Sequence, residues 1–133
     1  FYNGPEGLFR AQVGESWYSW SQLQSIDARA VFPSFDQPSF KTPFTVTVRT
    51  PPGLMAVSNA PEQAKTSEAG LDVHRFAPTR PLPTYLVALM VGPFASVAGE
   101  VAPTPQRASA LPLRVISPAP NAGKLDFALQ GSK

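Results

Sequence analysis

WYSWSQLQSIDARAVFPSFDQPSFK, residues 17–41, opens with aromatic side chains, carries two glutamines at alternate positions and closes on a segment of phenylalanines and prolines. Proline fixes φ at about −65° and favours an extended conformation in the residue before it. Pro33 and Pro38 therefore predict a rigid bend, which neighbouring phenylalanines can anchor in a core. We interpret the stretch as a strand, a short helical turn near residues 25–30 and a stiff loop that brings polar side chains to one place.

The first part of this stretch is expected to present different side chains to its two sides. Trp17 is predicted to lie in the core, as is Phe40 at the far end of the loop. Alternate side chains of a strand point to the same side. We therefore expect one face with two aromatic rings and two carboxamides, which would form a wall of a substrate cleft. Its members are Tyr18, Trp20, Gln22 and Gln24.

The rest of the chain predicts short strands, because sixteen prolines and nine glycines interrupt it every few residues. The apolar run from Tyr85 to Val91 is expected to form a strand buried on both faces. A helix is expected to start near residues 124–130. Together these patterns predict an all-β fold, a sandwich or saddle of mostly antiparallel strands. The other predicted strands are 8–13, 15–24, 44–49, 54–58, 71–76, 94–101 and 111–116, with a further hairpin arm in 62–70.

Composition limits the possible functions. A length of 133 residues fits one domain, and a net charge of +2 with only 15% charged residues argues against a nucleic-acid partner. There is no cysteine, so disulfides and thiolate metal sites are excluded. No apolar run approaches the roughly 20 residues that a membrane span requires. Both ends of the sequence look like cuts through a longer polypeptide.

No complete catalytic set is visible in the sequence. Zinc hydrolysis needs three protein ligands, but the chain has a single histidine and lacks H-E-x-x-H and phosphate-binding loops. A triad of Ser67, His74 and Asp72 is conceivable, yet these residues are more simply read as polar groups on an exposed strand. Asp27 and Arg29 are expected to be structural. Asp36 is expected to accept backbone N–H bonds within the bend.

Residues 22–41 follow the pattern Q-x-[QE]-x-x-x-A-R-x-x-F-P-x-F-D-x-P-x-x-K. This pattern resembles the amino-terminal domain of the aminopeptidase N family, zinc exopeptidases whose relatives include the bifunctional leukotriene hydrolase. The segments G-L-F-R, A-V-S-N and Y-L-V-A-L also fit, so the resemblance covers nearly the whole chain. The matching residues are Gln22, Gln24, Ala28, Arg29, Phe32, Pro33, Phe35, Asp36, Pro38 and Lys41.

The resemblance implies that residues 1–117 are part of an amino-terminal β-domain. Residues 118–133 would be the connection and first helix that lead to a catalytic domain of the same polypeptide. The zinc ion, its ligands and the glutamate base would lie beyond Lys133. This chain alone is therefore expected to hold no metal, to supply no catalytic residue and to be inactive.

By the same resemblance, Gln24 would hold the α-amino group of a peptide with a free N-terminus, and Gln22 would line the pocket for its first side chain. Gln24 stands where many members have glutamate, so it supplies no full negative charge. Two alternatives stay open. The glutamines can simply hydrogen-bond at a domain face, and the chain can be a free-standing β-sandwich binding or interaction module without catalytic activity.

Overall fold

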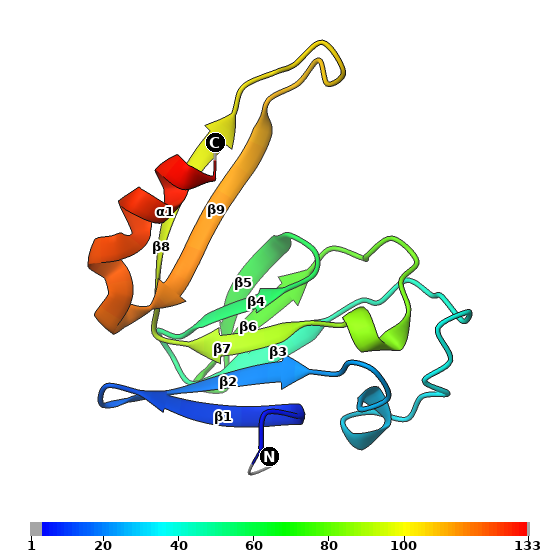
Figure 1. Ribbon diagram of the computed structural model, residues 1–133. Helices are drawn as coiled ribbons and strands as arrows, with labels where there is room; N and C mark the ends of the chain where they lie inside the picture. Colours follow the sequence, from blue (N-terminus) through cyan, green and yellow to red (C-terminus); the bar gives the residue numbers. More distant parts are fainter. Residues whose placement is uncertain (1–3, 133) are drawn as a thin grey trace. The chain divides into compact units, whose positions relative to one another are not determined.

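The computed structural model describes residues 4–132 and divides the chain into two compact units, one up to Pro93 and one from Phe94 onward. Antiparallel strands dominate both units (Figure 1). The predicted fold class, all-β with mostly antiparallel strands, is therefore confirmed.

Four strands of the first unit form an antiparallel sheet in the order β1-β2-β7-β4. Strands β1 (Gly7–Val13) and β2 (Ser16–Gln22) are a hairpin, blue in Figure 1. The turn between them passes through Gly14 at φ 62°, a left-handed conformation that glycine adopts without strain. Strand β7 (Leu89–Gly92) lies between β2 and β4 (Met55–Ser58), and β4 forms the other edge.

A second antiparallel sheet of the first unit has the order β3-β6-β5. Its strands are β3 (Thr47–Thr50), β6 (Leu71–Phe76) and β5 (Glu62–Glu68). Ala69 and Gly70, both with positive φ, make the tight turn between β5 and β6. Every residue of β5 is exposed, whereas most of β6 is buried, so β6 is the interior strand of this sheet.

A small apolar cluster supports the loop that follows β2. Its buried members are Leu23, Ala28 and Val87, and Val31, Phe32, Phe44 and Leu82 pack against them. Ala28 belongs to the single turn η1 (Ala28–Ala30), which confirms the helical turn predicted near residues 25–30. The cluster therefore anchors residues 23–32, the middle of the 17–41 stretch, in the core.

The predicted strand 85–91 is wrong in its first half. A 3₁₀ turn, η2 (Thr84–Leu86), follows Pro83 there, and the strand begins only at Leu89. Asn59 occupies the backbone groups that a strand would use: its side chain donates to the Leu86 carbonyl at 2.8 Å and accepts from the Ala88 N–H at 2.7 Å. Apolar composition indicated burial correctly for Val87 but not the local conformation.

The predicted placement of the aromatic side chains is also wrong at three positions. Trp17 and Phe40 are 53% and 60% exposed, whereas Tyr18 is only 1% exposed and belongs to the core. The guanidinium of Arg10 lies over the Trp17 ring at 4.8 Å. Tyr18 therefore cannot form a cleft wall, whereas Gln22, on the same side at the end of β2, is exposed.

The second unit is a hairpin with a helix. Strands β8 (Phe94–Val101) and β9 (Leu111–Pro118) pair along their whole length. The turns η3 (Ala119–Lys124) and α1 (Leu125–Gly131) follow, and the helix start predicted near residues 124–130 is confirmed. Leu125 is buried and Leu129 lies against Gly99 of β8, so α1 packs on the hairpin.

The close approach of Gly92 to Tyr18 gives a test of the packing within the first unit. A Cβ atom at Gly92 would lie 2.3 Å from the ring of the buried Tyr18. Gly92→Ala is therefore expected to lower the free energy of unfolding by about 1–3 kcal/mol through overpacking. Urea unfolding measures the effect. Gly123→Ala is the control, because open space surrounds Gly123; equal effects of both substitutions would refute the assigned contact.

Candidate substrate-binding site

The two candidate glutamines stand at the end of β2 and just after it. Gln22 is the last residue of the strand and pairs with Gly7 of β1. Gln24 lies beyond the strand, so the predicted continuation to residue 24 is two residues too long. Both are exposed, and Leu23 between them is buried in the apolar cluster. Their predicted contacts with a substrate stay a prediction.

The backbone after Gln24 forms a compact turn. The peptide bond between Gln24 and Ser25 is cis. The Asp27 N–H donates to the Leu23 carbonyl at 3.1 Å, and the Phe32 N–H donates to the Ala28 carbonyl at 2.9 Å. Gln24 is thus held in a turn that is closed by backbone bonds and anchored by the buried side chain that precedes it.

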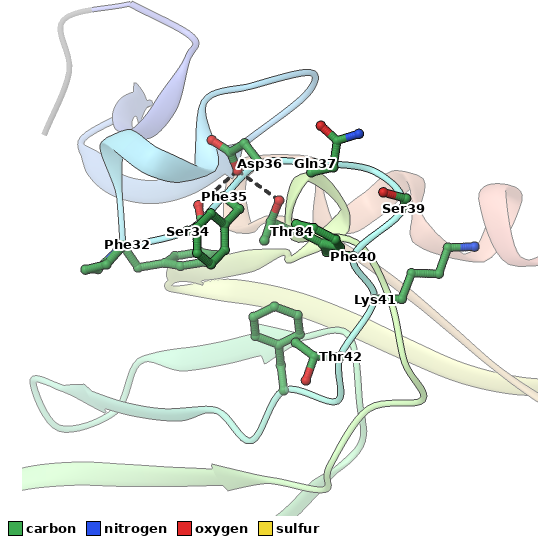
Figure 2. A pocket seen from close by; sticks show the side chains of 12 residues that line it. Phe32, Ser34, Phe35, Asp36, Gln37, Ser39, Phe40, Lys41, Thr42 and Thr84 are labelled. Atoms are coloured by element: carbon green, nitrogen blue, oxygen red, sulfur yellow. Dashed lines mark hydrogen bonds between the residues drawn. The ribbon is translucent and has the colours of Figure 1, made fainter.

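Asp36 ties this turn to the loop and to η2. Its carboxylate accepts hydrogen bonds from the Arg29 N–H at 2.8 Å and the Arg29 Nε at 2.9 Å. The Ser34 hydroxyl donates to it at 3.0 Å and the Thr84 hydroxyl at 2.8 Å, as Figure 2 shows. Asp36 does accept a backbone N–H bond, but from Arg29 in η1 and not from within the bend as predicted. Its pairing with Arg29 and Thr84, 48 residues away, was not foreseen.

Burial of Asp36 raises the pKa of its carboxyl, but the hydrogen bonds from the Arg29 side chain and backbone, Thr84 and Ser34 lower it more. The resulting pKa is about 2, below the ordinary value of 3.8. A carboxylate that accepts several bonds is favoured in its charged form. Asp36 is therefore ionised, and structural, throughout the neutral range.

This lowered pKa predicts an acid-sensitive contribution to stability. The contribution is complete above about pH 4 and is lost as the pH falls through the folded pKa of about 2. We expect Asp36→Asn to lower the free energy of unfolding by about 1–2 kcal/mol at pH 7, allowing for solvent screening at this surface loop. The variant and the unsubstituted chain should converge near pH 2 in urea unfolding.

Asp27→Asn is the matched control for this measurement. Asp27 lies in the same loop at the cap of η1 and makes no capping bond with its side chain. Its substitution should leave the free energy of unfolding at pH 7 close to that of the unsubstituted chain. A difference between Asp36→Asn and the unsubstituted chain that persists at pH 2 would contradict the assigned role of the carboxylate.

Next to this clamp, the loop forms an open pocket of about 450 Å³. Phe35 and Phe40 lie at the pocket with their rings edge to face, centroids 5.9 Å apart, and Lys41 also lines it (Figure 2). Phe32, which packs against the apolar cluster, connects the pocket to the core. The sequence marked these phenylalanines as anchors of a core, but only Phe32 has that position.

The possible triad is not formed. The Ser67 hydroxyl donates to Asp72 at 3.2 Å, and neither residue bonds to His74. His74 Nδ1 lies 2.8 Å from Glu62 Oε1 and its Nε2 lies 3.1 Å from the Thr50 hydroxyl. His74 is 1% and Thr50 2% exposed, so the expected exposed strand is buried and the hydroxyl is closed to substrates. This hydroxyl–imidazole–carboxylate chain joins β3, β6 and β5.

The His74 chain gives a stability prediction. Both ring nitrogens of the buried His74 are engaged, Nδ1 by the Glu62 carboxylate and Nε2 by the Thr50 hydroxyl. Thr50→Val would leave the buried Nε2 of His74 without its hydrogen-bond partner and is expected to cost about 1–3 kcal/mol. Thr47→Val, an exposed threonine on the same strand, is the control in thermal unfolding. Equal melting temperatures for the two variants would rule out the bond.

Residues 4–132 offer no group of three or more His, Cys, Asp or Glu side chains placed to hold a metal ion. The one imidazole has both nitrogens engaged by Thr50 and Glu62, so the donor set of this part does not fit zinc. No helix within the same residues is long and apolar enough to cross a membrane.

A family model, the peptidase M1 N-terminal domain, matches residues 2–86. The chain belongs to this family. The match includes β1, β2, the turn with Gln24 and the Asp36 clamp, so the whole candidate site lies within the family domain. The resemblance inferred from the pattern at residues 22–41 is thereby confirmed, and the family that it belongs to is that of the zinc-dependent M1 aminopeptidases.

Curated relatives of this M1 domain are aminopeptidases. Aminopeptidase N of Streptomyces lividans is 40% identical over 99 residues, which are 73% of this chain and 11% of that protein. Leucyl aminopeptidase of Saccharolobus solfataricus is 33% identical over 94 residues, 71% of this chain and 12% of that protein. Aminopeptidase N of Acetobacter pasteurianus is 36% identical over 115 residues, 85% and 30% of the two. The chain thus spans a small part of the relatives that it matches.

Proposed function

We propose that this M1 domain is part of a zinc-dependent aminopeptidase that removes N-terminal residues from peptides. Within it, Gln24 binds the α-amino group of the substrate and Gln22 lines the pocket for the first side chain. The observation that carries the proposal is the match of the M1 N-terminal domain over the segment that holds both glutamines. The exposure of both residues supports it, because a binding carboxamide has to be accessible.

The chemistry of the carboxamide suits this role. The Oε1 atom of glutamine accepts from an ammonium group, and the Nε2 atom can donate to a carbonyl of the same substrate. A hydrogen bond to a charged group contributes about 1.5–3 kcal/mol, more than a bond between neutral groups. Because the turn that carries Gln24 is closed by backbone bonds and braced by Arg29 and Asp36, little ordering is needed on binding.

The remainder of the site is assigned to the catalytic domain of the same polypeptide. In this proposal residues 1–117 are part of the amino-terminal β-domain and residues 118–133 lead into the catalytic domain. The zinc ion and its ligands belong there, since the donor set of residues 4–132 does not fit the metal. The chain alone would neither bind zinc nor turn over peptides.

Kinetics of the complete enzyme test the role of Gln24. Gln24→Ala is expected to raise KM and to lower kcat/KM for unblocked peptides about tenfold or more, which corresponds to one bond to a charged amine. The variant should also have a lower affinity for an inhibitor with a free amine, but an unchanged affinity for the analogue that lacks this amine. Gln12→Ala, an exposed glutamine of the same hairpin, is the control. Unchanged kinetics of Gln24→Ala would refute the substrate-amine role.

The alternative of a free-standing binding module makes a different prediction about size. The intact mass of the natural protein should be several-fold above 14.2 kDa, with bound zinc, if the proposal is correct. A natural protein near 14.2 kDa without peptidase activity would support the module instead.

A further inference from the structure

Two aromatic rings stand out from the loop that precedes β3. Phe35 is 85% exposed and Phe40 60% exposed, and they form one edge-to-face pair. The pocket of about 450 Å³ beside them is lined mainly by apolar atoms of this loop, together with Lys41. An exposed aromatic pair next to a pocket is typical of an interaction site, because large rings give much buried area for little lost side-chain entropy.

The pair is held in place before any partner binds. Asp36 lies between the two rings in the sequence, at φ 46°, and its four hydrogen bonds fix the backbone there. The Phe40 N–H donates to the Gln37 carbonyl at 2.9 Å, which closes a turn around Pro38. A rigid loop that presents rings to solvent pays little entropy when they become covered.

The charged groups at the pocket leave room for an apolar partner surface. The Asp36 carboxylate is neutralised by Arg29 and points into its own clamp. Lys41 has an ammonium group on a flexible stem that can stay in water while the stem packs. The rings therefore offer an apolar contact with a single cation at its rim.

We propose that the Phe35–Phe40 pair is the anchor on which the catalytic part of the longer polypeptide packs. This inference rests on the proposed function, because it takes its partner from the same chain. Two observations favour that partner. The matched segments make up 11% and 12% of two curated relatives, so most of their length lies outside this domain. The Arg29–Asp36 clamp also ties the loop of the rings to the turn of Gln24, so one docked partner can complete both.

Cysteine labelling of the complete protein tests this inference. The chain has no cysteine, and Ser39 is an exposed residue at the pocket. In Ser39→Cys the new thiol should react more than about tenfold slower than the same thiol in a short unstructured peptide, because it reacts only when the interface opens. Trypsin cleavage after Arg29 and Lys41 yields residues 30–41, on which mass spectrometry reads this one label.

Substitution of the rings then separates docking from other causes of protection. Phe35→Ala with Phe40→Ala should restore fast labelling of residue 39, whereas leucine at both positions should keep most of the protection. Glu15→Cys, in the exposed turn between β1 and β2, is the control and should label at a rate that the ring substitutions do not change.

Two outcomes would overturn the inference. Labelling of residue 39 at the rate of the free peptide would show that the pair is uncovered. Protection that disappears on dilution would make a second copy of the protein the partner. Neither outcome affects the Gln24→Ala kinetics, so this inference can fail while the proposed function stands.

Discussion

The hydrogen bonds of the Asp36 carboxylate are the interactions on which the candidate site depends. The carboxylate gathers donors from η1, from the loop and from η2, segments that are 7 and 48 residues away from it in the sequence at Arg29 and Thr84. Its bonds with Arg29 join the turn that follows Gln24 to the proline-rich loop. A buried carboxylate survives here because each of its oxygens has partners, so its desolvation is compensated.

A second buried polar chain shows why geometry alone does not define a catalytic site. Thr50, His74 and Glu62 have the hydroxyl–imidazole–carboxylate order of an acyl-transfer triad at hydrogen-bond distances. The hydroxyl is nevertheless enclosed by the sheet, and the three residues come from three adjacent strands that they hold together. The Thr50 hydroxyl has the spacing of a catalytic group but is not accessible to a substrate, whereas the glutamines are exposed.

Local sequence patterns predicted strands and turns well, whereas the burial of single side chains and the hydrogen-bond partners of Asp36 and η2 depend on residues distant in sequence. Strand β8 coincides with the predicted residues 94–101, because period-2 alternation and flanking turn residues are local signals. The sequence pattern also identified the M1 domain and singled out Asp36. It misplaced Trp17 and Phe40, because hydrophobicity does not tell which apolar rings find a partner within this domain. The partners Thr84 of Asp36 and Asn59 of η2 are distant in sequence, so no local pattern reveals them.

The edge strand β5 has a consequence for how copies of this protein behave at high concentration. Self-pairing of two β5 strands, antiparallel and centred on Lys65, would place Lys65 opposite Lys65 and Glu62 opposite Glu68. Like charges directly opposite each other destabilise a strand pair. The register also shifts between Glu62 and Ala64, which interrupts a flat edge. In this register, the charge pattern of a fully exposed strand of seven residues therefore disfavours edge-to-edge pairing of two copies.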